Sequence, residues 1–188
     1  MEQIGRPRPV SFFQKEHHVE AQREFVVLDI ETTGFSKYTD SIVEIAALKF
    51  IDCVEVDRFV TLVNPGRLIP KAVVAVHHIT DSMVKDAPAI SEVMPAFLQF
   101  VGDSLIVGHN TNFDVGFLDE AARKLGYAPD WRYVDTIPVA KRILPGLRNY
   151  KQATVLEAIG YKQQQFHRAE QDCRGCAQIL LLAMDRIS

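Results

Sequence analysis

The sequence has few cysteines, no long apolar run and no excess of positive charge, and each absence excludes a class of protein. The longest strongly apolar run, Ile179–Met184, has about six residues, far fewer than the roughly 20 that a membrane-spanning helix needs. The first residues, Met1–Glu20, carry charges of both signs and no apolar segment, so they are not a secretory signal. Cys53, Cys173 and Cys176 are too few for a disulfide framework. We therefore expect a protein of the reducing cytoplasm.

Positive charge is also in short supply. The 188 residues include 21 Lys and Arg against 24 Asp and Glu, which gives a formal net charge of -3. Proteins that coat nucleic acids without regard to sequence are strongly basic, so this composition excludes that class. With 47% hydrophobic and 24% charged residues, the chain has the composition of an ordinary globular protein, and its length predicts a single domain.

The N-terminal segment differs from the rest of the chain. Residues 1–22 are polar and contain two prolines, which predicts an arm that is flexible unless Phe12 and Phe13 anchor it. Residues 23–188 contain no linker, repeat or low-complexity tract, so we expect them to form the single domain.

Apolar patterning predicts strands in the first half and an alternation of strands and helices in the second. Phe25–Ile30 is almost entirely apolar, as expected of a central strand buried on both faces. The expected elements that follow are a hairpin of strands Ile42–Ile51 and Val54–Val63, a loop region with His77–Thr80, helix Ile90–Val101, strand Ser104–Val107, helix Asp114–Leu125, strand Tyr133–Asp135, helical segments up to Ile159, and helix Arg168–Ile187. This order predicts an α/β sandwich around one mixed sheet.

Two acidic residues lie at the end of the most apolar strand. Asp29 and Glu31 are two residues apart, so both side chains point to the same face, about 6.6 Å apart along the strand. Such a pair can be two surface groups at a strand end that reaches solvent. It can also be part of a catalytic or metal site.

A third acid, Asp114, lies on the apolar stripe of its predicted helix, four residues before Leu118. The helix dipole favours an acid in the first turn, which explains its nearness to the helix start but not its face. The preceding loop, residues 108–112, is polar and directly follows a buried strand. Loops between a strand and a helix are where α/β proteins place their sites.

A fourth acid, Asp172, flanks the buried stripe of the last predicted helix, and His167 lies about one turn earlier. Alone, a histidine before a helix is more often a cap or a surface residue than a catalyst. Cys173 and Cys176 lie on the core stripe itself, and the chain has no second C-x-x-C motif. We therefore interpret these cysteines as core packing rather than as a redox or zinc motif.

The four acids come from three separate elements and lie near apolar faces. Carboxylates gathered in such a place would repel one another unless a cation is bound. Oxygen ligands favour Mg²⁺ or Mn²⁺ over zinc. Two such ions stabilise the attacking and leaving oxygens of a phosphodiester, and a neutral histidine can accept a proton from the attacking water. Two bound divalent ions would also raise the net charge from -3 to +1, which permits a nucleic-acid substrate.

Five sequence blocks carry a family resemblance. They are Leu28–Gly34 (LDIETTG), Ile42–Ala47 (IVEIAA), Val63–Gly66 (VNPG), Gly108–Leu118 (GHNTNFDVGFL) and His167–Asp172 (HRAEQD). In this order they resemble the His-containing branch of the DEDD exonucleases, which includes the proofreading epsilon subunit of bacterial DNA polymerase III and the exonuclease domain of Gram-positive polymerases. The resemblance implies an α/β, RNase H-like fold with a mixed five-stranded sheet flanked by helices.

The resemblance also implies an activity and a site. The activity would be 3′-to-5′ hydrolysis of nucleic-acid ends to nucleoside 5′-monophosphates, in DNA replication or repair. Asp29, Glu31, Asp114 and Asp172 match the acids that hold two Mg²⁺ or Mn²⁺ ions, and His167 matches the general base. The expected substrate-binding residues are Thr32, Thr33, His109, Asn110 and Phe113.

The expected substrate is a single-stranded 3′ end, with DNA favoured over RNA, and a DNA polymerase subunit is a candidate partner. The alternatives are an RNA-trimming exonuclease of the same fold, and a non-catalytic module for nucleic-acid binding or polymerase docking. Contacts to the nucleic-acid backbone are expected from position alone for Arg67, Arg148, Lys151 or Arg168.

The chain departs from the family pattern at a few positions. The family often has His-Gly-Ile where this chain has His77, His78 and Ile79. Gln171 stands where an acid is common, and Gln152 where leucine is common. None of these changes removes a catalytic residue. We favour a loop or substrate-side role for the two histidines over zinc, because adjacent residues rarely bind one ion.

Overall fold

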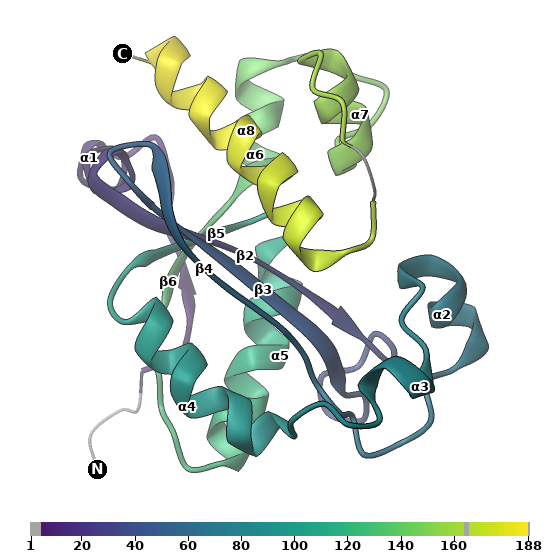
Figure 1. Ribbon diagram of the computed structural model, residues 1–188. Helices are drawn as coiled ribbons and strands as arrows, with labels where there is room; N and C mark the ends of the chain where they lie inside the picture. Colours follow the sequence, from purple (N-terminus) through teal and green to yellow (C-terminus); the bar gives the residue numbers. More distant parts are fainter. Residues whose placement is uncertain (1–4, 164–165, 188) are drawn as a thin grey trace.

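The computed structural model describes residues 5–163 and 166–187, and a mixed six-stranded sheet runs through its centre (Figure 1). The strands are β1 (Arg8–Pro9), β2 (Glu24–Thr32), β3 (Ile42–Ile51), β4 (Val54–Leu62), β5 (Leu105–Gly108) and β6 (Arg132–Asp135). Their order across the sheet is β1-β6-β5-β2-β3-β4. The pairs from β1 to β2 are parallel, whereas β3 pairs antiparallel with both β2 and β4.

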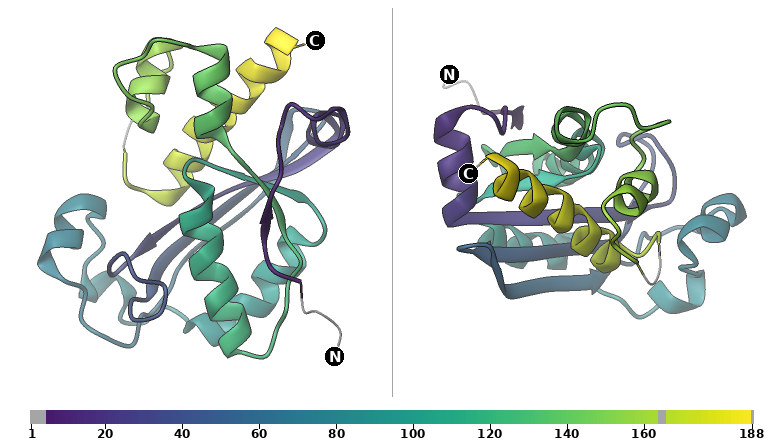
Figure 2. Two further views of the ribbon diagram at one scale, coloured as in Figure 1. Left: turned by 180° about the vertical axis from the view of Figure 1, so that it is seen from behind. Right: turned by 90° about the horizontal axis from the view of Figure 1, so that it is seen from above.

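Helices cover both faces of this sheet. They are α1 (Lys15–Arg23), α2 (Lys71–His77), α3 (Asp81–Val84), α4 (Ile90–Val101), α5 (Thr111–Lys124), α6 (Thr136–Ile143), α7 (Gln152–Ala158) and α8 (Ala169–Ile187). α8 crosses one face, as the view from above shows (Figure 2), and α4 and α5 pack on the other (Figure 1). Within the described ranges, no helix combines the length and the apolar composition that crossing a membrane requires.

Side-chain alternation along β2 separates two cores and directs the acids toward one of them. Val26 and Leu28 belong to the core that α4 and α5 cover, whereas Phe25 and Val27 belong to the core under α8. The next side chain in the second series is Asp29, followed two residues later by a second acid. The face that packs against α8 therefore changes from apolar to acidic toward the carboxyl end of β2.

The predicted α/β architecture around one mixed sheet is confirmed, with two differences in detail. The sequence predicts five strands and the structure has six, because Arg8–Pro9 adds a two-residue edge strand beside β6. The predicted loop region with His77–Thr80 is wrong at His77, which is the last residue of α2. α2 ends at His77, and the φ of the next residue, His78, is 62°, in the left-handed region where a glycine would fit without strain.

The described part of the predicted N-terminal arm packs on the body of the protein. Phe12 is 2% exposed and belongs to the core under α8. Arg132 of β6 donates to both carboxylate oxygens of Glu20 in α1, at 2.5 and 2.6 Å. These contacts join Phe12 and α1 to the body of the protein, and the domain boundary at residue 23 stays a prediction.

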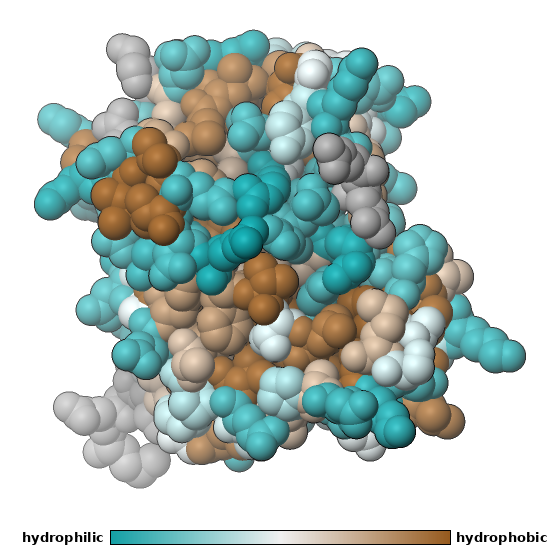
Figure 3. All heavy atoms as spheres, viewed as in Figure 1, coloured by the Kyte–Doolittle hydropathy of each residue, from teal (hydrophilic) through white to brown (hydrophobic). Residues whose placement is uncertain are grey.

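Ion pairs join α8 to the edge strand β4. Arg174 donates to both carboxylate oxygens of Glu55, at 2.5 and 3.1 Å, and Arg58 contacts Glu170 at 3.1 Å. Figure 3 shows hydrophilic side chains across this part of the surface, whereas hydrophobic side chains gather over β4 and α4. Charged pairs therefore join α8 to β4 at the surface, whereas the apolar face of α8 packs on β2 and β3.

Candidate active site

A cleft of about 570 Å³ lies at the carboxyl ends of β2 and β5, the edge where open α/β sheets bind ligands. Its walls come from β2, the start of α5, the start of α7 and the segment before α8. The lining residues are Asp29, Ile30, Glu31, His109, Asn110, Phe113, Asp114, Lys151, Gln152, Ala153, Phe166, His167 and Asp172. The structure thus brings together the four predicted metal-site acids, the predicted general base and three of the predicted substrate-binding residues.

Glu31, His167 and Asp172 lie close enough to share one ion. One ligand atom from each of the three side chains lies within 4.8 Å of the other two. His167 is exposed and lies two residues before α8, whereas Asp172 is 9% exposed in the first turn of α8. Gln163 donates to a carboxylate oxygen of Asp172 at 2.6 Å, which fixes one side of that carboxylate.

Asp114 approaches the same place from α5. It is 4% exposed in the first turn of the helix, and its carboxylate accepts a hydrogen bond at 3.1 Å from the backbone N–H of Ile30. That N–H lies between Asp29 and Glu31 on β2, so the hydrogen bond joins the helix start directly to the strand that carries the other acids. The acid on the apolar stripe of α5 is therefore turned toward the sheet, as its spacing predicts.

Burial and mutual repulsion keep these acids from ionising easily. Burial raises the pKa of Asp29 well above its ordinary value, and the charges of Asp114, Asp172 and Glu31 raise it further. Burial raises the pKa of Glu31 to about 8, aided by the charge of Asp172, whereas the charge of Arg168 lowers it. Burial also raises the pKa of Asp114 to about 8, despite the hydrogen bond from Ile30. The pKa of Asp172 is raised by burial as well.

The donor set fits a divalent cation. Four carboxylates with raised pKa values face one cleft, and a bound cation would favour their charged forms and remove the repulsion between them. The donors are oxygen atoms with one imidazole beside them, which suits Mg²⁺ or Mn²⁺ better than a thiolate-preferring metal. Cys173 and Cys176 are 0% and 2% exposed and belong to the core under α8, which confirms their predicted packing role.

Three predicted substrate-binding residues line the cleft, and they differ in whether their side chains are open to a ligand or already hydrogen-bonded. Asn110 is exposed and Phe113 is half-buried, so both present side-chain surface to a ligand. The ring nitrogens of His109 are already engaged, Nδ1 with the hydroxyl of Thr136 and Nε2 with the carbonyl of Tyr150, each at 2.8 Å. Burial lowers the pKa of His109, which favours a neutral ring that braces the cleft wall.

Thr32 and Thr33 lie just beyond the cleft, at the end of β2. Neither is among the described residues that line it. The Thr32 hydroxyl donates to the carbonyl of Gly34 at 2.6 Å, and the Thr33 hydroxyl oxygen accepts from the backbone N–H of Ser41 at 3.0 Å. Both threonines therefore shape the turn that follows β2, and their role toward a substrate stays a prediction.

His77 and His78 lie at the end of α2 and are not among the described residues that line the cleft. His77 is 2% exposed, and its Nδ1 accepts a hydrogen bond at 3.0 Å from the backbone N–H of Ile79. The imidazole of His77 thus stabilises the end of its own helix.

The basic residues expected to contact a nucleic-acid backbone differ in whether their side chains are already paired with an acid. Lys151 lines the cleft. Arg67 contacts Asp40 at 3.9 Å, and the exposed Arg148 contacts Glu157 at 3.6 Å. The guanidinium of Arg168 donates to the buried carboxylate of Glu44. Lys151 is therefore the basic side chain best placed to meet a phosphate in this cleft.

Three polar residues around the acids were not predicted as site residues, and they are Gln152, Gln163 and Glu44. The side-chain amide of Gln152 donates to the backbone carbonyl of Asp172 at 2.7 Å, and the side-chain amide of Gln163 donates to the carboxylate of Asp172. Nothing in the polar stretch around Gln163 marks it. Glu44 was signalled, because it is the single acid in the apolar strand Ile42–Ile51, and it belongs to one of the family blocks.

Comparison with known proteins agrees with this geometry. The exonuclease family RNase_T matches residues 26–180. The chain is 40% identical over 172 residues to the PolC-type DNA polymerase III of Caldanaerobacter subterraneus subsp. tengcongensis, and 42% identical over 159 residues to that of Thermotoga maritima. These stretches cover 92% and 84% of the chain but only 12% of each polymerase.

Solved structures give the same result. Exonuclease X in complex with 5′-overhanging duplex DNA is 31% identical, with a TM-score of 0.69 over 86% of this chain and 92% of that one. The zinc-bound E. coli Exonuclease I complex with single-stranded DNA has a TM-score of 0.79 at 18% identity, over 88% of this chain and 41% of that one, and supports the fold alone. The predicted RNase H-like fold class is confirmed by these neighbours. Since the family model covers residues 26–180, most of the chain, the chain belongs to the exonuclease family.

Proposed function

We propose that this exonuclease removes nucleotides from the 3′ end of single-stranded DNA and releases nucleoside 5′-monophosphates, with two Mg²⁺ or Mn²⁺ ions and a histidine base. One observation carries the proposal. Asp29, Glu31, Asp114 and Asp172 converge in an open cleft without a neutralising cation at contact distance among the described side chains, and His167 stands beside them. A protein that only bound nucleic acid would gain nothing from this costly concentration of negative charge.

The four acids would hold the ions. Divalent ions bound there would polarise the phosphodiester and stabilise the charge that develops on the attacking and leaving oxygens. Asp114 is suited to a fixed ligand role, because the backbone N–H of Ile30 holds its carboxylate. Asp172 is held in the same way by Gln163. The carboxylates are thus oriented before a substrate arrives.

His167 would act as the general base. It is exposed at the cleft and its ring lies beside Glu31 and Asp172, so a water molecule bound near these acids would be within its reach. In its neutral form one ring nitrogen can accept the proton of that water as the water attacks the phosphorus. The leaving group would be the 3′ oxygen of the preceding nucleotide.

DNA is the favoured substrate because of the proteins that this chain resembles. The relatives are DNA polymerases, and the Exonuclease X structure contains a DNA duplex with an overhang. An RNA-trimming exonuclease of the same fold stays the second candidate. The relatives also make a DNA polymerase a candidate partner, with a role in DNA replication or repair, although the chain spans only 12% of the polymerases that it matches.

The test is a nuclease assay on four matched 5′-labelled oligomers, namely single-stranded DNA, paired DNA, mismatched DNA and RNA. With Mn²⁺ or Mg²⁺ we expect single-stranded DNA to shorten one nucleotide at a time from its 3′ end, with mismatched ends cut faster than paired ends. The variant Asp114→Asn serves as the inactive control. Faster digestion of RNA would favour the second candidate, and internal cuts would contradict the proposal.

A further inference from the structure

A fifth acid, Glu44, lies behind the four that line the cleft. It is 2% exposed on β3 and stands directly opposite Glu31 in the register of β2 and β3. Its side chain is on the same face of β3 as Ala46 and Leu48, which belong to the core under α8. Glu44 is therefore a carboxylate in an apolar layer, where an unpaired charge would be strongly destabilising.

The carboxylate of Glu44 is paired by the chain on the C-terminal side of His167. The Nη2 of Arg168 donates to it at 2.7 Å, and the Nε of Arg168 lies 3.2 and 3.3 Å from its two oxygens. The backbone N–H of Ala169 donates to it at 3.0 Å. Three N–H groups from two consecutive residues thus bind one buried carboxylate, and these residues directly follow His167.

His167 itself needs such support. Its φ is 59°, in the left-handed region that a residue with a side chain holds only when its surroundings enforce it. Its ring is exposed, so packing does little to fix the segment that carries it. The backbone of His167 and of Arg168 is hydrogen-bonded to Asp172 on α8, and the neighbouring contact with Glu44 ties the same segment to β3 beneath the cleft.

We propose that Glu44 and Arg168 are positioning residues that hold His167 at the catalytic cleft. The planar guanidinium suits this role, because it bonds to a carboxylate through two N–H groups in one fixed orientation, which a lysine cannot reproduce. The pair acts through His167 and makes no contact with the substrate. This inference rests on the proposed role of His167 as the general base.

The helix offers a matched control. Arg174, six residues further along α8, bonds to both carboxylate oxygens of Glu55 on β4, so it also ties α8 to the sheet through an arginine and a glutamate. This second pair lies away from His167. If Arg168 only anchors the helix, the variants Arg168→Lys and Arg174→Lys should have similar effects.

The experiment compares these two variants in the wild-type and His167→Ala backgrounds. We expect Arg168→Lys to lower kcat about 10-fold or more with KM within about twofold, because a small displacement of a catalytic group is costly. Arg174→Lys should change kcat by less than about twofold. In the His167→Ala background, Arg168→Lys should have no further effect on kcat, because a positioning residue has nothing left to position.

A readout independent of activity is the NMR spectrum of the protein labelled at histidine. The His167 ring signals, assigned by their loss in His167→Ala, should shift or broaden in Arg168→Lys and stay unchanged in Arg174→Lys. If Arg168→Lys does not fold, as judged by its thermal melt, Glu44→Gln replaces it in the same assays, because the amide keeps the size of the side chain and an acceptor for the Ala169 N–H.

Three results would overturn the inference. The first is equal behaviour of the two arginine variants. The second is a rise in KM at unchanged kcat, which would make Arg168 a phosphate contact. The third is that Arg168→Lys lowers kcat by the same factor in the His167→Ala background as in the wild-type protein. Failure of the proposed function is a separate result, seen as wild-type protein without metal-dependent nuclease activity or as His167→Ala with normal activity.

Discussion

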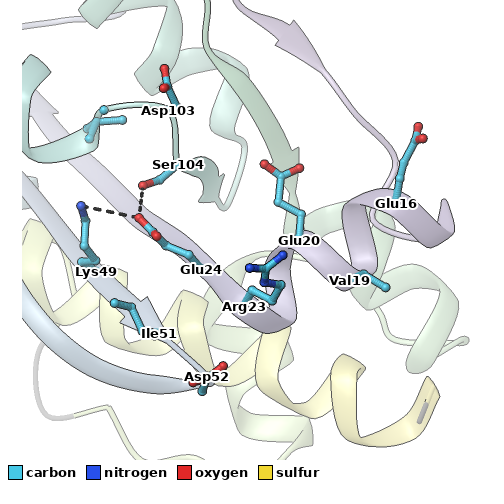
Figure 4. Close-up of a pocket in the computed structure, with 12 residues that line it drawn as sticks. Glu16, Val19, Glu20, Arg23, Glu24, Lys49, Ile51, Asp52, Asp103 and Ser104 are labelled. Carbon is cyan, nitrogen blue, oxygen red and sulfur yellow. Dashed lines mark hydrogen bonds and ion pairs between the residues drawn. The ribbon is translucent and has the colours of Figure 1, made fainter.

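The two ends of β2 both carry acids beside a large cavity, but their charges are arranged differently. At the amino end, Glu24 lines a cavity of about 660 Å³ (Figure 4), accepts a hydrogen bond from the Ser104 hydroxyl at 2.7 Å and pairs with Lys49 at 3.7 Å. At the carboxyl end, Glu31 lines the cleft of about 570 Å³ among other acids. Burial and the neighbouring charges raise the pKa of Glu31 to about 8.

The difference shows that cavity size alone does not identify the working end of the sheet. At the larger cavity Glu24 is paired with Lys49 and Glu20 with Arg132, so these two acids have basic partners within the protein. The smaller cleft gathers four carboxylates whose pKa values are raised by burial and by one another's charges. A site for a divalent cation is the physical reason to accept that cost.

The largest expected effect separates the two ends by activity. Asp29→Ala should abolish metal-dependent digestion of a DNA strand, because it removes an acid from the centre of the proposed cation site. Glu24→Ala, at the other end of the same strand, should retain activity within about twofold. The check is the rate of mononucleotide release by the two variants at equal protein concentration. Similar losses in both would mean that β2 is only being destabilised.

The next effect concerns the base at the carboxyl end. His167→Ala should lower kcat by about 10²-fold or more, the usual contribution of a general base, while the thermal melt stays unchanged because the side chain is exposed. The measurement is single-turnover cleavage of a short DNA strand. Near-normal turnover would remove His167 from the mechanism.

A smaller effect should appear in stability against pH. The folded-state pKa values of Glu31 and Asp114 are raised to about 8 by burial, whereas both are near 4 in an unfolded chain. The folded state then binds more protons between these values, so the free energy of unfolding falls as the pH rises from about 5 to about 8. The metal-free protein should melt at a lower temperature at pH 8 than at pH 5.5.

Two controls sharpen this prediction. Mn²⁺ should restore the melting temperature at pH 8, because it binds the folded carboxylates. Glu31→Gln should raise the pH 8 melting temperature of the metal-free protein, whereas Glu24→Gln should leave the pH dependence as it is. A melting temperature that rises steadily with pH in EDTA would show that the acids of the cleft are already paired.

The smallest effect is expected at the amino end of β2, where Glu24 is paired with Lys49. Lys49→Met removes the partner of Glu24, whose side chain is 46% exposed, and should reduce the free energy of unfolding by only about 0.2–1 kcal/mol, as for other surface pairs. Urea denaturation measures this difference. A loss several times larger would mean that the amino end of β2 depends on its charges more than the geometry indicates.

Most of the fold could be predicted because its signals are local. The apolar run Phe25–Ile30 marks a strand buried on both faces, and the spacing of Cys173 and Cys176 marks the buried stripe of α8. The short elements gave weaker signals. β1 is a strand only because β6 lies beside it, and α2 is too short for a clear helical period.

The site could be predicted as far as side-chain direction follows from the pattern. Asp29 and Glu31 share a face because strands alternate, and Asp114 lies on an apolar stripe, so both signals are visible in the sequence. The contact of Gln163 with Asp172 depends on how an irregular segment folds back on α8, which no period describes. Glu44 carried the same signal as Asp29, an acid on an apolar face, and only the structure shows its partner.

The most direct test of the difference between the two ends is Mn²⁺ binding, followed by electron paramagnetic resonance and calorimetry at pH 8 without substrate. Wild-type protein and Glu24→Gln should each bind two Mn²⁺ ions per chain, whereas Asp29→Asn and Asp114→Asn should lose at least one of them. Binding that survives in both aspartate variants, or that disappears in Glu24→Gln, would contradict the assignment of the cation site to the carboxyl end of β2.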